Sequence, residues 1–281
     1  MAKAPDGIYL LKQIDALIRG AEGAISDKMQ GFQDALIKDL VRELNKLLTI
    51  QDSDILQSAE NMKSIKQIRA LLDRFFSSKQ YLATVREAVT PYDAISQGLT
   101  EYFALIAPDF EIQAQFVKAT IDFYKNQTIE LLAGEGVNTN IKAQLERIIF
   151  QGIENGAPLA SLEASTAEYL AGVDGALVRY SKQVTTDTLN TFSRAYTEGV
   201  AEGLGLEHYY YSGTEIKTTR DFCDKRIGKY FTKAEVEAWA SQKWAGKKAG
   251  TNKDTIYKYL GGYNCRHKLL PVTEIMYNRN K

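Results

Sequence analysis

Hydrophobic residues recur at intervals of three, four or seven through most of the first 204 residues, which is the spacing of an amphipathic helix. The longest such stripe runs from 8 to 48 and predicts a long helix. Three glycines interrupt this stripe: Gly20, Gly23 and Gly31. Because a glycine inside a helix costs about 1 kcal/mol relative to alanine, we expect a break or a bend in that region.

Polar caps and prolines divide the rest of this region into shorter predicted helices. Residues 52–54 (Asp-Ser-Asp) provide a cap for a second helix ending at Phe76, and the two serines at 77–78 break or dent it. Further helices are expected over 79–90, 91–106, 108–133, 138–155, 158–172 and 174–204. Since no strand signal precedes residue 204, the sequence predicts an elongated, mainly α-helical region over 1–204. Its apolar stripes are expected to pack helix against helix, within the chain or between subunits.

The pattern changes after residue 204. Residues 208–213 are aromatic and end at a glycine, as a strand running into a turn does. Residues 228–231 predict a second strand or an extended turn, and 269–272 predict a closing strand. Between them, residues 232–235 (Thr-Lys-Ala-Glu) form the capping box that starts a helix. The sequence therefore predicts a small α+β module over 205–281.

Charge is distributed unevenly between these two parts. The 281 residues contain 35 basic and 35 acidic side chains, so the formal net charge is zero. The segment 205–281 carries a net charge of about +7 and the helical part about −7, which suggests two units with different surroundings. No apolar run is long enough for a signal peptide or a membrane helix, and two cysteines are too few for a secreted disulfide framework. We expect synthesis in a cytosol and no membrane partner.

Five short motifs follow one another inside the C-terminal module. They are Tyr211 with Gly213, Thr219-Arg220-Asp221-Phe222-Cys223, Gly228-Lys229, Gly261-Gly262-Tyr263-Asn264-Cys265-Arg266-His267, and Pro271-Val272. In this order, over residues 208–272, they resemble the conserved module of the phage minor head proteins, the Mu F-like head-morphogenesis family. The pattern of that family is a strand, Thr-Arg-x-x-Cys, Gly-Lys, and Asn-Cys-Arg-His ahead of a proline.

The resemblance implies a structural protein and not an enzyme. It implies a virion component inside the head or at the portal, made in the host bacterial cytoplasm and present in several copies. Its implied partners are the portal protein, the major capsid protein and packaged double-stranded DNA, and its implied role is head assembly, DNA packaging or DNA ejection. Two alternatives from other classes stay open: a nucleic-acid-processing enzyme or toxin delivered with the genome, and a DNA-binding adaptor.

Cys223, Cys265 and His267 are the soft metal ligands of the module. With a fourth ligand from Asp221, Asp224 or His208, they could hold a structural zinc ion. Two alternatives are a Cys223–Cys265 disulfide, which would close a loop of about forty residues, and a pair of packed thiols beside a histidine. A cysteine nucleophile with a histidine base is a further reading, although Cys265 and His267 are too close in sequence to favour it.

Arginines, lysines and tyrosines of the module each have a structural and a nucleic-acid interpretation. Arg220, Arg226 and Arg266 flank the cysteines and either bind phosphate or hold the module together through carboxylates and backbone carbonyls. A basic run either contacts DNA or is a solvated loop; it comprises Lys243, Lys247, Lys248, Lys253 and Lys258. The tyrosines either stack on bases or form the core, which is the expected outcome for a small domain: Tyr209 to Tyr211, Tyr230, Tyr257, Tyr259 and Tyr263.

Overall fold

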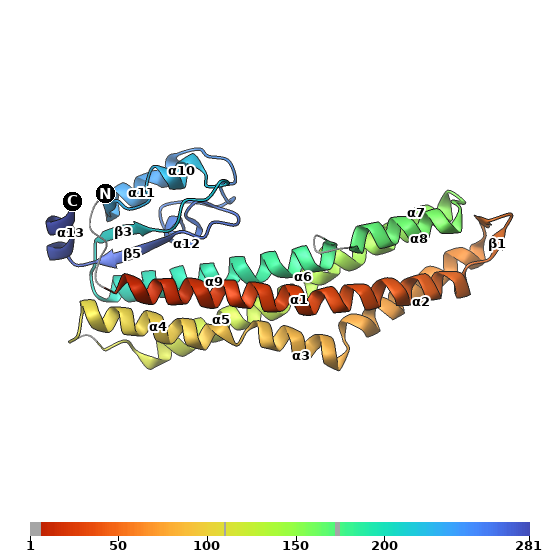
Figure 1. Ribbon diagram of the computed structural model, residues 1–281, viewed down its shortest axis with the longest axis horizontal. Coiled ribbons are helices and arrows are strands. Elements are labelled where there is room, and N and C mark those ends of the chain that lie inside the picture. Colours follow the sequence, from red (N-terminus) through yellow and green to blue (C-terminus); the bar gives the residue numbers. More distant parts are fainter. Residues whose placement is uncertain (1–6, 110, 172–174) are drawn as a thin grey trace. The chain divides into compact units, whose positions relative to one another are not determined.

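The computed structural model describes residues 7–109, 111–171 and 175–281, and the chain is mainly α-helical (Figure 1). This confirms the fold class expected from the hydrophobic pattern. The longer helices are α1 (Ile8–Leu47), α2 (Ala59–Phe76), α3 (Lys79–Ala88), α4 (Pro91–Ile106), α5 (Ala114–Ala133), α7 (Ala143–Glu154), α8 (Leu159–Leu170) and α9 (Ala176–Gly203). A single turn, α6 (Glu135–Val137), and a π-helical turn over Asn138–Lys142 connect α5 to α7.

The long helix α1 is continuous through all three glycines, so of the break or bend expected there, the break is wrong. An added Cβ at Gly20, Gly23 or Gly31 would meet no atom within 4 Å, and all three positions are exposed. The glycines therefore lower helix propensity without removing any buried contact. Fully buried leucines such as Leu36 and Leu40 stabilise the helix from its other face, because burial outweighs a propensity cost of about 1 kcal/mol per glycine.

A β-hairpin replaces the predicted helix start near residue 52. Strands β1 (Ile50–Gln51) and β2 (Asp54–Ile55) pair antiparallel, and Asp52 and Ser53 between them both have positive φ angles. Two consecutive positive φ angles are the geometry of a two-residue hairpin turn. The helix cap is Ser58, whose side chain accepts a hydrogen bond from the Asn61 amide at 3.1 Å. The expectation that no strand precedes residue 204 was therefore also wrong.

Serines end one helix and start the next at residues 77 and 78. The Ser77 amide donates to the Asp73 carbonyl and closes α2, while the Ser78 side chain accepts from the Tyr81 amide and caps α3. The helix is thus broken there, one of the two outcomes expected. Further along, α5 begins at Ala114, later than the proline at 108 suggested.

Two compact units make up the chain, and each is assembled from separate segments. Unit 1 comprises 1–20, 90–125 and 186–281, and unit 2 comprises 21–89 and 126–185. The change from helix to mixed structure falls between Gly203 and His208, at the expected boundary of the module. Unit 1 nevertheless includes the module together with parts of α1, α4, α5 and α9.

Unit 2 has a continuous aliphatic core with aromatic residues at one end. Tyr81 is fully buried there; its ring packs edge-on against Phe76 at 5.1 Å between centroids, and its hydroxyl donates to the Leu132 carbonyl at 2.8 Å. The buried core residues come from all the helices of the unit and include Leu36, Leu72, Val85, Ile149, Leu162 and Leu177.

The C-terminal module of unit 1 is built on a three-stranded antiparallel sheet. The strand order is β4 (Tyr230–Thr232), β3 (His208–Ser212), β5 (Lys268–Val272), so the central strand is the aromatic segment. Around it lie α10 (Asp221–Asp224), α11 (Lys233–Ala238), a 3₁₀ turn (Trp239–Ser241) and α12 (Ile256–Tyr259). The capping box at Thr232 and Glu235 is present and confirms that prediction.

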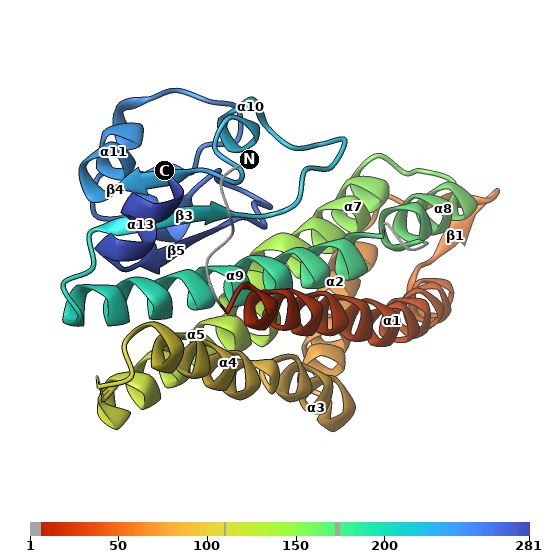
Figure 2. The same ribbon diagram turned by 60° about the vertical axis from the view of Figure 1, so that its left-hand side comes forward.

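A last helix, α13 (Glu274–Asn280), was not predicted from the sequence. Thr273 caps it by accepting from the Met276 amide at 3.3 Å, and Figure 2 shows it beside β3. Tyr277 on this helix packs against His208 with ring centroids 4.2 Å apart. The helix therefore covers one end of the sheet.

Buried contacts join the module to the helices of unit 1. The Tyr102 hydroxyl on α4 donates to the Pro271 carbonyl on β5 at 2.8 Å, and the buried Lys268 ammonium pairs with Asp15 on α1 at 2.6 Å. Phe192 on α9 is fully buried with its ring centroid 4.8 Å from that of Tyr92. The module and these helix segments thus share one packed body.

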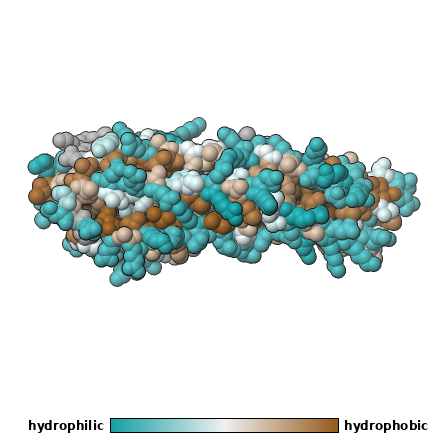
Figure 3. Space-filling view, turned by 90° about the horizontal axis from the view of Figure 1, so that it is seen from below, coloured by the Kyte–Doolittle hydropathy of each residue, from teal (hydrophilic) through white to brown (hydrophobic). Residues whose placement is uncertain are grey.

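Hydrophobic side chains at the surface are scattered. On the face that Figure 3 shows, short apolar patches are interrupted by hydrophilic residues. Among the described residues, the most exposed large apolar side chains are Ile275, Phe123, Tyr9, Ile216 and Leu105. None of the described helices combines the length and the apolar character that a membrane span requires.

Candidate functional site

The structure brings Cys223, Cys265 and His267 together inside the module. The two sulfur atoms lie 4.0 Å apart, and Sγ of Cys265 lies 3.7 Å from Nδ1 of His267. The candidate ligand atoms of all three residues lie within 4.8 Å of one another, and all three side chains are buried. Residues 42 positions apart in sequence are thus joined in one cluster of soft donors.

Two backbone segments deliver these side chains. Cys223 lies on α10, where its amide donates to the Arg220 carbonyl at 2.8 Å, while Cys265 and His267 lie in the loop before β5. That loop contains the positive φ angles of Leu260 (41°) and Asn264 (56°), which are unfavourable for side-chain-bearing residues. The loop is therefore held in its conformation by contacts made elsewhere.

Arg194, on α9, supplies those contacts. Its guanidinium donates to the carbonyls of His267 (3.0 Å), Lys258 (3.1 Å) and Cys265. Only 5% of Arg194 is exposed. A planar guanidinium with five N–H donors can satisfy several fixed carbonyls at once, so this residue fastens both ends of the Cys265–His267 segment to α9.

Glycines allow the backbone to approach the cluster closely. An added Cβ at Gly261 would lie 2.4 Å from Sγ of Cys223 and 3.0 Å from Sγ of Cys265. At Gly213, where φ is +155°, it would lie 2.2 Å from Cδ2 of His267. Neither position accepts a side chain without displacing the cluster. Both glycines belong to the motifs that carry the family resemblance.

Aromatic rings pack around the cluster. The Tyr211 ring stacks on His267 at 5.5 Å and meets Trp239 edge-on at 5.9 Å. Nε2 of His267 is buried and has no hydrogen-bond partner among the described residues. Burial raises the pKa of Tyr211 well above its ordinary value. The cluster therefore lies in a low-dielectric part of the module.

The two thiols have pKa values that are shifted in opposite directions. The hydrogen bond to Cys223 lowers the pKa of Cys265, assisted by the positive charge of Arg194 and by His267, although burial acts in the opposite direction. The hydrogen bond to Cys265 and burial raise the pKa of Cys223. Cys265 is therefore the sulfur that ionises first.

The residues expected to supply a fourth ligand lie elsewhere. Asp221 and Asp224 are exposed, and His208 packs against Tyr277; none of the three joins the cluster. Both cysteines are free thiols, and their sulfur separation is about twice the length of a disulfide bond. In the part of the chain that the structure describes, the cluster consists of three ligands.

A nucleophile–base mechanism has little geometric support here. Cys265 and His267 are 3.7 Å apart, but Nε2 of His267 has no partner among the described residues to orient the ring. A general base needs such an orienting group to hold its tautomer and direction. The described residues thus supply two members of a catalytic triad and no third.

The three flanking arginines have different surroundings. Arg220 donates to the Tyr263 carbonyl at 2.7 Å. Arg226 is buried, donates to the Phe222 carbonyl, and stacks over the Phe222 ring at 3.9 Å. Arg266 is exposed. The first two therefore connect α10 to its neighbours, whereas Arg266 is accessible from solvent.

The basic run does not form a single accessible strip. Lys247 donates to the carbonyls of Ala240 and Gln242, Lys248 lies over the rings of Tyr259 and Tyr263, and Lys258 pairs with Glu198 at 3.9 Å. Lys243 and Lys253 are exposed. Most tyrosines of the module are buried, namely Tyr209, Tyr210, Tyr211, Tyr230, Tyr257 and Tyr277, while Tyr263 is 47% exposed.

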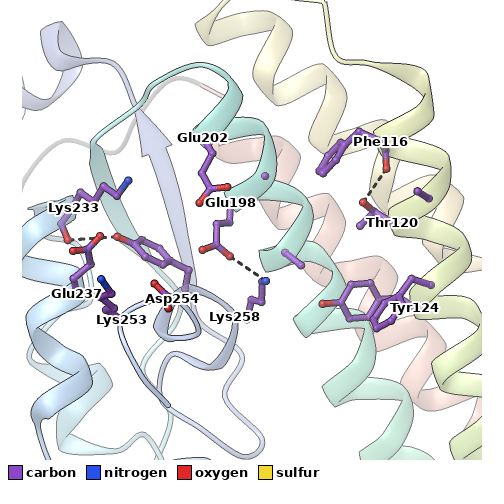
Figure 4. Close-up of a pocket in the computed structure, with 15 residues that line it drawn as sticks. Phe116, Thr120, Tyr124, Glu198, Glu202, Lys233, Glu237, Lys253, Asp254 and Lys258 are labelled. Carbon is purple, nitrogen blue, oxygen red and sulfur yellow. Dashed lines mark hydrogen bonds and ion pairs between the residues drawn. The ribbon is translucent and has the colours of Figure 1, made fainter. Parts of the chain in front are cut away.

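A cleft of about 630 Å³ lies between α5, α9 and the module, all within unit 1 (Figure 4). Phe116 and Tyr124 line its apolar side, and Glu198 points toward Lys258 across it. Burial raises the pKa of Glu198 to about 7, and the charge of Lys258 only partly offsets this effect. The cleft therefore contains a carboxyl group that gains or loses its proton near neutral pH.

Arg194 and Glu198 are the two residues near these sites that the sequence did not single out. Both occur in a helix whose apolar stripe includes Phe192 and Tyr196, and nothing in the spacing distinguishes a buried charge from a solvated one. Their partners lie sixty or more residues away in the chain, and a single sequence does not reveal such pairings. Comparison with protein-family models, curated proteins and solved structures gave no match.

Proposed function

We propose that this chain is a structural component of a phage head, a minor head protein of the head-morphogenesis type. It would act from inside the head or at the portal, in several copies, and contribute to head assembly, DNA packaging or ejection. It would be made in the host bacterial cytoplasm and would contact the portal or the major capsid protein. The proposal is of a structural role and not of catalysis.

The observation that carries the proposal is that the motifs behind the family resemblance contact one another. Gly213 packs on His267, Arg220 donates to the Tyr263 carbonyl, and Cys223 lies against Cys265. Motifs that match a pattern by chance have no reason to meet in space. Their convergence supports a module in which the pattern is a requirement of the fold.

Mass spectrometry of purified phage particles tests this proposal. We expect peptides of the chain in intact, nuclease-treated particles, at lower abundance than the major capsid protein. Cross-linking within the particles is expected to join lysines of the chain to the portal or major capsid protein. Particles that contain abundant capsid peptides and none from this chain would refute the virion assignment.

A nuclease assay separates this proposal from the enzyme alternative. The purified chain is incubated with double-stranded and single-stranded DNA in the presence of Mg²⁺ or Mn²⁺, beside the His267→Ala variant. We expect no cleavage by either protein. Robust cleavage by the parent chain that is lost in His267→Ala would overturn the structural role in favour of a nucleic-acid-processing enzyme.

A further inference from the structure

The Cys223, Cys265 and His267 cluster has the dimensions of a tetrahedral zinc site. With Zn–S bonds of about 2.3 Å and Zn–N bonds of about 2.0–2.1 Å, tetrahedral angles separate two sulfurs by about 3.8 Å and a sulfur from a nitrogen by about 3.5–3.6 Å. The corresponding separations in the chain are 4.0 Å and 3.7 Å. Two of the three donor separations therefore match a tetrahedral site to within a few tenths of an ångström, and the ligand atoms of all three residues lie within 4.8 Å of one another.

The imidazole of His267 is poorly satisfied by its protein neighbours. Nδ1 of His267 contacts only the sulfur of Cys265, and Nε2 has no hydrogen-bond partner among the described residues, although the residue is 7% exposed. Burying a polar group without a hydrogen bond is unfavourable. A metal bound at Nδ1 would replace the weak 3.7 Å and 4.0 Å contacts among Nδ1 and the two sulfurs with direct coordination, and it would leave Nε2 as the buried N–H donor of the ring.

The surroundings hold the donors in place without a metal. Arg194 fixes the carbonyls of both Cys265 and His267, and the Gly261 backbone packs directly against the two sulfurs. Contacts that orient the ligand-bearing segments are a regular feature of metal sites and raise their affinity. Two thiols that were merely packed in the core would not require Arg194 to hold the strained loop of residues 260–267 in place.

We propose that the chain binds one Zn²⁺ ion through Sγ of Cys223, Sγ of Cys265 and Nδ1 of His267, with a water molecule as the fourth ligand. Two thiolates neutralise the ion, and the thiol protons displaced on binding pass to solvent. Thiolate and imidazole donors favour zinc over the oxygen-preferring Mg²⁺ and Ca²⁺. The ion would join α10 to the loop before β5.

Metal analysis and cobalt substitution on the full-length chain test this proposal. The chain is expressed with added zinc, purified under reducing conditions and its metal content measured by plasma mass spectrometry. It is then stripped with a chelator and titrated with Co²⁺, which gives sulfur-to-metal charge-transfer bands and tetrahedral d–d bands when bound to thiolates. We expect about one zinc per chain and both sets of bands.

Variants locate the ion. Cys223→Ser, Cys265→Ser and His267→Gln are each expected to lose the stoichiometric metal. The matched controls Asp224→Asn and His208→Gln, at an exposed carboxylate and at the histidine outside the cluster, should keep it. Absence of zinc and of cobalt bands in the reduced parent chain would overturn the proposal, and so would metal retained in all three ligand variants.

A conservative replacement covers the case in which a ligand variant does not fold. His267→Cys keeps three donors and adds a thiolate, so the cobalt charge-transfer intensity should rise about 1.5-fold, from two thiolates to three. An unchanged intensity in folded His267→Cys would exclude position 267 as a ligand. These measurements use the isolated chain, so their outcome is independent of whether the protein occurs in virions.

Discussion

The buried guanidinium of Arg194 is the single contact on which the conformation of the Cys265–His267 segment depends most. Replacing Arg194 with methionine keeps a long apolar stem but removes all three donated hydrogen bonds. Hydrogen bonds from a charged donor contribute about 1.5 kcal/mol or more each, and losing the buried charge offsets part of this. We expect Arg194→Met to lower the free energy of unfolding by about 2–4 kcal/mol.

Urea denaturation followed by tryptophan fluorescence measures this change. Both tryptophans, Trp239 and Trp244, lie in the module, so their emission reports on its unfolding. Arg194→Lys keeps the positive charge, but a lysine ammonium lacks the planar guanidinium that reaches all three carbonyls. We expect this variant to lose about half as much unfolding free energy as Arg194→Met. The matched control is Arg266→Met, an exposed arginine in the same loop, which we expect to cost less than about 1 kcal/mol. Equal effects of the Arg194 and Arg266 substitutions to methionine would refute the assigned role.

Four further substitutions test other parts of the structure. The pKa of Glu198 is raised to about 7, so between pH about 4.5 and 7 the folded chain keeps a proton that the unfolded chain has released. The free energy of unfolding should therefore fall as pH rises through this range. Glu198→Gln should abolish that fall, which would leave the variant up to ~3 kcal/mol more stable than the parent at pH 8. Parallel profiles of unfolding free energy against pH for the parent and the variant would contradict this prediction. Gly213→Ala would place a Cβ 2.2 Å from the imidazole of His267 and should lower the free energy of unfolding by several kcal/mol. The control is Gly250→Ala, where φ is also positive but the space is open, and it should cost at least about 2 kcal/mol less. Equal thermal midpoints for the two variants would contradict this prediction. Ser53→Gly should stabilise the hairpin of unit 2 by about 0.5–1 kcal/mol, because φ at this position is 75° and glycine adopts a positive φ without strain. Ser58→Ala should cost about 1 kcal/mol, because it removes the side chain that caps α2. A thermal midpoint lower in Ser53→Gly than in Ser58→Ala would reject the assignment of a hairpin at residues 50–55 and a helix cap at Ser58.

Much of the fold followed from hydrophobic periodicity, because long stripes leave few other ways to bury apolar surface. The bounds of α4 and the three strands of the module agree with the predicted segments to within a residue or two. The predicted cap at residues 52–54 failed for a specific reason. Asp and Ser favour both helix caps and tight turns, and only the φ angles of Asp52 and Ser53 distinguish the two.

The candidate site was only partly accessible to sequence reasoning. The motif order selected Cys223, Cys265 and His267, and the structure brings them together. Of the suggested fourth ligands, Asp221 and Asp224 are near in sequence but exposed, because their direction on α10 depends on packing, and His208 on β3 packs against Tyr277. Arg194 could not be predicted from the sequence, because its partners are three backbone carbonyls that lie 64 to 73 residues later in the chain. Every residue has a backbone carbonyl, so the sequence does not mark which ones a buried arginine binds.

The ion pair between Asp15 and Lys268 has a consequence for biosynthesis. These residues are 253 positions apart, so one end of the pair leaves the ribosome long before the other exists. Segments 1–20 and 90–125 of unit 1 must wait for residues 186–281, whereas all of unit 2 is available once residue 185 has emerged. Loop-closure entropy makes such distant pairings late steps in folding. In a nascent chain halted near residue 204, unit 2 would therefore be complete, while the apolar surface of segments 1–20 and 90–125 would still be uncovered. That exposed surface is where a chaperone would bind.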